Sequence, residues 1–77
     1  MALVRRFEQK PMERNSLHKE IAATYSVFGI DDKRVVQIDT YGSADREIPG
    51  KKSQTIQLDR EGAENLFLIL KNEFGFR

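Results

Sequence analysis

The chain has 77 residues, of which 39% are hydrophobic and 32% are charged, with no cysteine and a formal net charge of +1. A chain this short forms one domain and buries only about 60–65% of its unfolded surface, so its own core must be thin. Without cysteine there are neither disulfides nor thiolate metal sites, which leaves dimerisation as the expected further source of stability. The charge is too small to indicate a nucleic-acid binder by itself. With no apolar stretch of about 18–20 residues and no secretory signal, we expect a cytoplasmic protein without a membrane partner.

Residues 1–19 form a basic segment, with five Lys or Arg against two Glu. Leu3 and Phe7 alternate weakly with polar neighbours, which predicts either a short edge strand or a flexible basic arm. The polar string from 10 to 17, which contains Pro11, is typical of a connection. We therefore divide the chain into an N-terminal arm or edge strand, 1–19, and a sheet-plus-helix domain, 20–77.

The first part of that domain predicts an antiparallel sheet. Residues 21–28, 35–41 and 53–58 alternate between apolar and polar side chains, as half-buried strands do. Gly29 and two aspartates separate the first two runs and predict a hairpin loop over 29–33. A longer loop, 42–52, ends at Pro49-Gly50. Alternation places the following residues on one outward face: Thr24, Ser26, Phe28, Gln37, Tyr41, Ser53, Thr55 and Gln57.

A helix is predicted after Asp59, a good N-cap, and Gly75 stands where a C-terminal cap belongs. Its apolar residues at helical spacing include Leu66, Leu70 and Phe74, and neighbouring apolar residues widen the surface beyond what one small sheet needs. A second chain could bury the excess. We therefore expect an α+β fold, with an antiparallel sheet of three to four strands followed by one C-terminal helix packed on one face, in a homodimer.

The sequence carries little sign of catalysis. His18 is the only imidazole and has no partner positioned by spacing. Asp39, Asp45 and Glu47 could be imagined around a magnesium ion, but surface salt bridges explain them equally well. The scattered glycines form no phosphate-binding loop. We therefore expect no enzyme, no metal, no cofactor and no small-molecule substrate.

The outward face combines aromatic rings with cations at its borders, which is the combination that binds single-stranded nucleic acid. Phe28 and Tyr41 could each stack on a base; equally, Phe28 could turn into the core and Tyr41 could pack across strands. The bordering cations could also be ordinary solvated charges. The residues predicted to contact nucleic acid are Phe28, Lys33, Arg34, Tyr41, Arg46, Lys51, Lys52 and Gln57.

Residues 35–41 (VVQIDTY), residues 49–58 (PGKKSQTIQL) and the capped helix after Asp59 together resemble the family of the single-stranded-DNA-binding transcriptional coactivator positive cofactor four and its bacterial and phage relatives. With residues 21–28, the resemblance covers about two-thirds of the chain. It implies a dimer that grips melted or single-stranded DNA, with Lys51 and Lys52 on phosphates and Arg34 and Tyr41 near the strand. The chain departs from the family in its acidic loop residues, short helix and missing basic excess.

The leading hypothesis is a non-catalytic, homodimeric module that binds single-stranded DNA, or RNA, in transcription, replication or repair. The alternative is a protein-interaction or assembly module whose open sheet takes up a partner strand, with no nucleic-acid ligand. A metal-dependent nuclease, or an accessory subunit of a DNA-processing enzyme, is a weaker third hypothesis.

Overall fold

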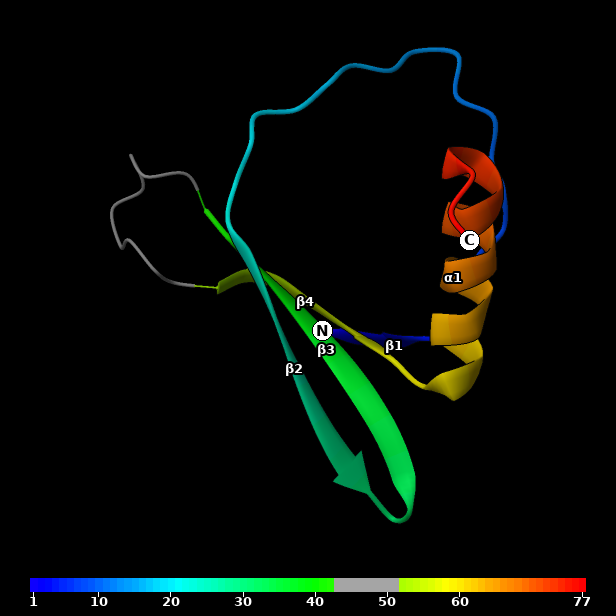
Figure 1. Cartoon of the computed structure of the whole chain (residues 1–77). Coiled ribbons are helices and arrows are strands. Elements are labelled where there is room, and N and C mark those ends of the chain that lie inside the picture. Colours follow the sequence, from blue (N-terminus) through cyan, green and yellow to red (C-terminus); the bar gives the residue numbers. More distant parts are fainter. Residues whose placement is uncertain (43–51) are drawn as a thin grey trace.

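The computed structural model describes residues 1–42 and 52–77, which form one sheet and one helix (Figure 1). The sheet has the order β1-β4-β3-β2, so β3 and β4 are its central strands. This confirms the predicted α+β class. The elements are β1 (Ala2–Val4), β2 (Ala23–Ile30), β3 (Lys33–Tyr41), β4 (Lys52–Leu58) and α1 (Arg60–Phe74).

Strands β2 and β3 form a tight antiparallel hairpin. Its two turn residues, Asp31 and Asp32, have positive φ angles of 50° and 64°, which is the geometry that two-residue hairpin turns require. Aspartate tolerates this left-handed backbone better than most residues. The turn is therefore shorter than the predicted loop over 29–33, and both strands extend further toward it.

Strand β4 pairs with β3 in an antiparallel register that places Gln57 opposite Gln37 and Thr55 opposite Asp39. An irregularity between Thr40 and Tyr41 shifts the register. The predicted loop between these strands lies almost entirely outside the described residues, as do Arg46 and Lys51.

The prediction of a purely antiparallel sheet is wrong, because β1 pairs with β4 in parallel, with Ala2 beside Ile56 and Val4 beside Leu58. Parallel neighbours need a long connection between them, and residues 5–22 lead from β1 to β2 without helix or strand. The edge-strand alternative thus holds for Ala2–Val4, while the rest of the N-terminal segment is irregular chain.

Helix α1 begins and ends where the sequence predicts. The Asp59 carboxylate accepts a hydrogen bond from the Gly62 amide at 2.9 Å, and Gly75 closes the helix with a φ of 71°. No helix in the described parts of the chain is long and apolar enough to cross a membrane.

The first turns of α1 are held by the segment that follows β1. Gly62 is buried against the Val4 carbonyl, and the Phe7 amide donates to Asn65 Oδ1 at 2.8 Å. From Phe67 onward the helix is exposed, although α1 also contacts β3 and β4. The predicted packing of the helix on one sheet face is therefore limited in a single chain to the start of α1. Among the described hydrophobic side chains, Val35 and Leu58 are the buried ones.

Candidate functional site

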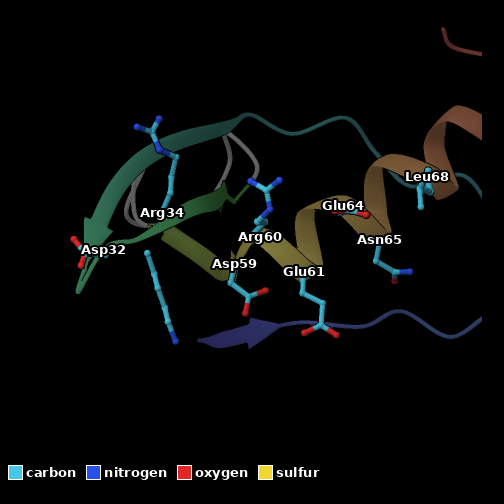
Figure 2. A pocket seen from close by; sticks show the side chains of 9 residues that line it. Asp32, Arg34, Asp59, Arg60, Glu61, Glu64, Asn65 and Leu68 are labelled. Atoms are coloured by element: carbon cyan, nitrogen blue, oxygen red, sulfur yellow. The ribbon is translucent and has the colours of Figure 1, made fainter.

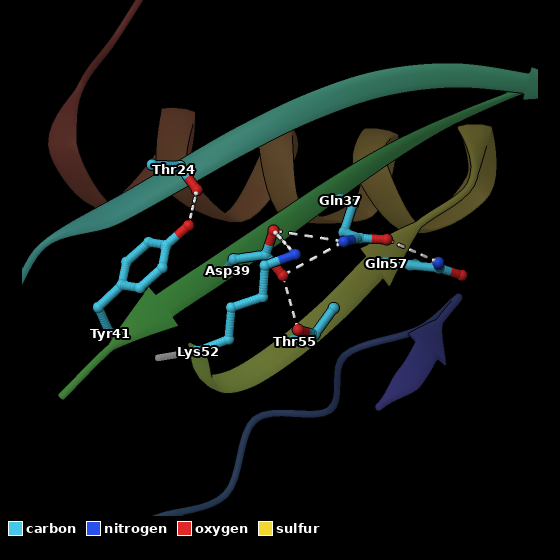
Figure 3. A network of polar contacts seen from close by, with 7 residues as sticks. All are labelled: Thr24, Gln37, Asp39, Tyr41, Lys52, Thr55 and Gln57. Atoms are coloured by element: carbon cyan, nitrogen blue, oxygen red, sulfur yellow. Dashed lines mark hydrogen bonds and ion pairs between the residues drawn. The ribbon is translucent and has the colours of Figure 1, made fainter. Parts of the chain in front are cut away.

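One surface of the sheet gathers polar side chains from three strands, and we call it the polar face. The register places most of these residues opposite or next to one another as alternation predicts, and α1 lies behind the sheet in the view of Figure 3. The exception is at the end of β4, where the irregularity between Thr40 and Tyr41 puts Lys52, rather than the predicted Ser53, opposite Tyr41. The members of the polar face are Thr24, Ser26 and Phe28 on β2, Gln37, Asp39 and Tyr41 on β3, and Lys52, Thr55 and Gln57 on β4.

Asp39 is the centre of the polar face and is only 4% exposed. Thr55 Oγ1 donates to its Oδ1 at 2.6 Å, and Gln37 Nε2 lies 3.2 and 3.3 Å from its two oxygens. The Thr55 hydrogen bond lowers the pKa of Asp39, burial opposes this, and Gln37 and Lys52 lower the pKa further. Asp39 is therefore an ionised carboxylate at neutral pH.

The hydrogen bonds around Asp39 continue across the face. Gln57 Nε2 donates to Gln37 Oε1 at 3.0 Å, and Gln37 in turn donates to Asp39 (Figure 3). In this series of hydrogen bonds, each donor points toward the Asp39 carboxylate. The side chains of the central strands are thus held in fixed orientations by the buried charge of Asp39, a residue that the sequence suggested only as a magnesium ligand or a surface salt-bridge partner.

Tyr41 lies at one end of the polar face, where its hydroxyl and the Thr24 hydroxyl are 2.9 Å apart (Figure 3). This hydrogen bond ties the ring of a β3 residue to β2 and restricts its rotation. The ring is half-buried, so part of it stays accessible.

Phe28 belongs to the other end of the same face. It is directly opposite Val35, one of the two buried hydrophobic residues of the described chain, and is itself half-buried. Such a pair is typical of cross-strand packing, which favours the packing role for Phe28 over the stacking role.

Of the predicted cations that the structure describes, Lys52 reaches the centre of the polar face. Its Nζ lies 3.5 Å from Asp39 Oδ2, and its side chain is 55% exposed. A half-exposed lysine in so long a contact is able to turn toward a phosphate.

Lys33 and Arg34 lie at the opposite end of β3, about 26 Å from Tyr41 at 3.3 Å per residue. They border a shallow depression between the β2–β3 turn and α1, and Figure 2 shows the carboxylates of Asp59 and Glu61 on the side away from the Arg34 guanidinium. Acidic side chains balance the basic ones there. The structure therefore does not bring Lys33 and Arg34 together with Lys52, and alternation also directs Arg34 to the other sheet surface.

Two basic residues of the N-terminal segment are paired with acidic residues at the start of α1, a contact that was not predicted from the sequence. Arg5 Nε donates to Asp59 Oδ2 at 2.8 Å, and Arg6 Nε lies 3.6 Å from Glu61 Oε1. Asp59 and Glu61 lie at the helix N-terminus, where acidic residues are favoured. They are the sequence feature from which partners for nearby basic residues could have been predicted.

In residues 1–42 and 52–77 no group of three or more His, Cys, Asp or Glu is placed to hold a metal ion. Asp45 and Glu47, the imagined partners of Asp39 in a magnesium site, lie outside these residues. No protein-family model, curated protein or solved structure matches the chain. The resemblance to positive cofactor four therefore stays a prediction from the sequence.

Proposed function

We propose that this chain is a non-catalytic module that binds single-stranded nucleic acid, DNA in the first instance and RNA as an alternative, across its polar face. It acts as a homodimer in the cytoplasm. The observation that carries the proposal is the tethered Tyr41 ring beside Lys52, since an aromatic ring next to a half-exposed cation is the basic unit of single-strand binding.

The dimensions of the face suit an extended ligand. Tyr41 is six residues along β3 from Val35, or about 20 Å at 3.3 Å per residue. Up to about six stacked bases fit this length at 3.4 Å per base. The amide and hydroxyl groups in between offer hydrogen bonds to base edges, which a strand whose bases are unpaired presents freely.

The buried charge of Asp39 is compatible with an anionic ligand. Thr55 and Gln37 already donate hydrogen bonds to this carboxylate, and the Thr55 hydrogen bond is the largest single cause of its lowered pKa, ahead of Gln37 and Lys52. Lys52 can therefore move to a phosphate while Asp39 keeps two uncharged donors.

The shape of a single chain supports the dimer. Its radius of gyration is 14.8 Å, whereas a compact domain of this length has about 11 Å. Large apolar side chains are exposed on the second half of α1 and on β2, including Phe67 and Leu68 at 53% and Tyr25 at 76%. A second copy would bury part of this surface, as patches of this kind commonly require.

The test is a fluorescence-anisotropy titration with single-stranded and duplex oligonucleotides of the same sequence at two salt concentrations. We expect tighter binding to the single strand, with log K falling by about 0.7 per phosphate contacted for each unit of log salt. Lys52→Ala lowers both affinity and salt slope, while Lys71→Ala, which removes the same charge from α1, changes neither. Absence of binding at low salt, or an unchanged Lys52→Ala variant, would refute the proposal.

A specific observation favours the second candidate, a protein-interaction or assembly module. Strand β2 is an edge of the sheet, and its apolar residues Tyr25, Val27 and Ile30 are 76%, 47% and 57% exposed. An edge of this kind accepts a partner strand. If the second candidate is correct, the chain binds an extended peptide, and added single-stranded DNA does not compete.

A further inference from the structure

We infer that Asp39 gives the polar face a base preference, because it turns its neighbours into hydrogen-bond acceptors that favour donor-rich bases, guanine first and thymine last. This inference rests on the proposed function and adds the chemical class of ligand that the same face selects.

The ionised carboxylate of Asp39 accepts hydrogen bonds and donates none. Thr55 has one hydroxyl hydrogen, and at 2.6 Å from Asp39 Oδ1 it must direct that hydrogen to the carboxylate. The Thr55 oxygen is then left with lone pairs. Toward any ligand above the sheet, Thr55 is therefore an acceptor.

The same constraint fixes the two amides. Gln37 can face a carboxylate only with its NH₂ group, as its distances of 3.2 and 3.3 Å to the Asp39 oxygens require. Its carbonyl oxygen must then point away, where it accepts from Gln57 Nε2 at 3.0 Å. Gln57 has thereby committed one of its two hydrogens and keeps its own carbonyl oxygen as an acceptor.

The result is an acceptor on each of two neighbouring outward positions of β4. Thr55 and Gln57 are two residues apart on one strand, so their side chains emerge on the same face about 6.6 Å from each other. Both are half-buried rather than covered. Turning the Gln37 amide group around would place its Oε1 against the buried Asp39 carboxylate, which is strongly unfavourable.

Bases differ in what they offer to such acceptors. Guanine carries a ring N–H and an exocyclic amino group on one edge, cytosine and adenine carry one amino group, and thymine carries carbonyl oxygens on both sides of its ring N–H. A carbonyl oxygen of thymine would be repelled where it faces the Thr55 oxygen or the Gln57 carbonyl oxygen. Guanine is accordingly the base that the polarised face favours most.

The experiment compares one mixed-sequence single strand with the same strand in which inosine replaces every guanine, a change that removes the amino group and keeps the stacking rings. We expect the wild-type chain to bind the guanine strand several-fold more tightly. Gln57→Met, which keeps the length of the side chain without the acceptor, reduces the ratio of affinities toward one. Asp39→Asn also reduces the ratio toward one, because an amide both donates and accepts and therefore no longer fixes the orientation of Thr55 and Gln37.

Gln54→Met is the matched control, since Gln54 lies on the same strand as Gln57 but is opposite Thr40 on the other sheet surface; it retains the ratio. Circular dichroism checks folding, and Gln57→Met keeps the test valid if Asp39→Asn does not fold. Equal wild-type affinities for the two strands, or an unchanged ratio in Gln57→Met, would overturn this inference and leave the proposed function standing. Absence of binding to either strand at low salt would overturn both.

Discussion

Arg5 Nε donates to Asp59 Oδ2 at 2.8 Å, although 54 positions separate the two residues. The other oxygen of the same carboxylate accepts from the Gly62 amide at 2.9 Å. A single side chain thus caps α1 and fastens the segment after β1 to the start of the helix. The hydrogen bond from the Gly62 amide is the largest single cause of the lowered pKa of Asp59; burial opposes it, and the hydrogen bond and charge of Arg5 lower the pKa further.

Substitutions at this junction should separate the two roles of Asp59. Asp59→Ala removes both cap and ion pair, and we expect the thermal midpoint to fall by several degrees. Arg5→Ala removes only a pair whose arginine side chain is 61% exposed, so its effect should be much smaller. Asp59→Asn keeps a capping oxygen and should resemble Arg5→Ala. Thermal unfolding followed by circular dichroism measures all three, and an Arg5→Ala loss equal to that of Asp59→Ala would contradict this division.

Gly62 is the position where α1 can approach β1 closely. A Cβ atom there would overlap the Val4 carbonyl oxygen and lie 3.2 Å from Arg5 Cα. Both neighbours are backbone atoms, so relief requires the chain to shift, and we expect Gly62→Ala to destabilise by about 1–3 kcal/mol despite the better helix propensity of alanine. Urea unfolding gives the value.

The matched control for that substitution is Gly29→Ala, where the added Cβ would lie 3.5 Å from the Lys33 carbonyl, an ordinary contact. Its stability should stay within about 0.5 kcal/mol of the wild type. Similar losses in both variants would show that the loss of glycine itself, rather than the contact with β1, is responsible.

Acid should destabilise the fold through Asp39 and Asp59. The Thr55 hydrogen bond lowers the pKa of Asp39 in the folded chain, and the Gly62 amide lowers that of Asp59. Near pH 4 the unfolded chain therefore binds more protons, so the stabilisation is complete above the ordinary aspartate pKa of about 3.9 and is lost as pH falls through the lower folded values. Thermal midpoints measured from pH 7 to strongly acidic pH should show this decline. Asp39→Asn should make the decline shallower; an unchanged slope would exclude Asp39 as a contributor.

The sequence predicts most of the fold because most of its signals are local. The alternation in β2, β3 and β4 and the caps at Asp59 and Gly75 are each legible within a few residues. The parallel pairing of β1 is different: three residues carry no reliable period, and their partners lie 54 positions away. Pairing at that distance depends on how the connection over 5–22 folds back.

The candidate site shows the same division. Alternation correctly assigns Gln37, Tyr41 and Gln57 to one face, because side-chain direction in a strand depends only on position. Alternation alone does not show that Lys33 and Lys52 occupy opposite ends of the sheet; that follows from the antiparallel order of β3 and β4, in which Lys52 pairs with Tyr41. The burial of Asp39 was also beyond prediction, because the side chains that surround it come from two strands.

The second half of α1 should determine whether the chain dimerises. Phe67 and Leu68 are each 53% exposed, so Phe67→Glu and Leu68→Glu should leave the single-chain fold intact. In the proposed dimer they would place a charge in a desolvated apolar contact, and we expect at least a tenfold weaker association. Analytical ultracentrifugation measures this, with Glu64→Gln on the first half of the helix as the control. A wild-type chain that stays monomeric at high concentration would refute the dimer.

Tyr41 offers the most direct test of stacking, because its ring and its hydroxyl can be removed separately. Tyr41→Ala removes the ring, and the loss of one base stack should cost about 1–3 kcal/mol, or roughly 5- to 150-fold in affinity for a single strand. Tyr41→Phe keeps the ring but breaks the hydrogen bond to Thr24, and we expect a loss of about threefold because the ring is then less restricted. Thr24→Val breaks the same hydrogen bond from the other side and should match Tyr41→Phe. Anisotropy titrations at one salt concentration compare the three variants, and equal effects of Tyr41→Ala and Tyr41→Phe would mean that the ring does not stack on a base.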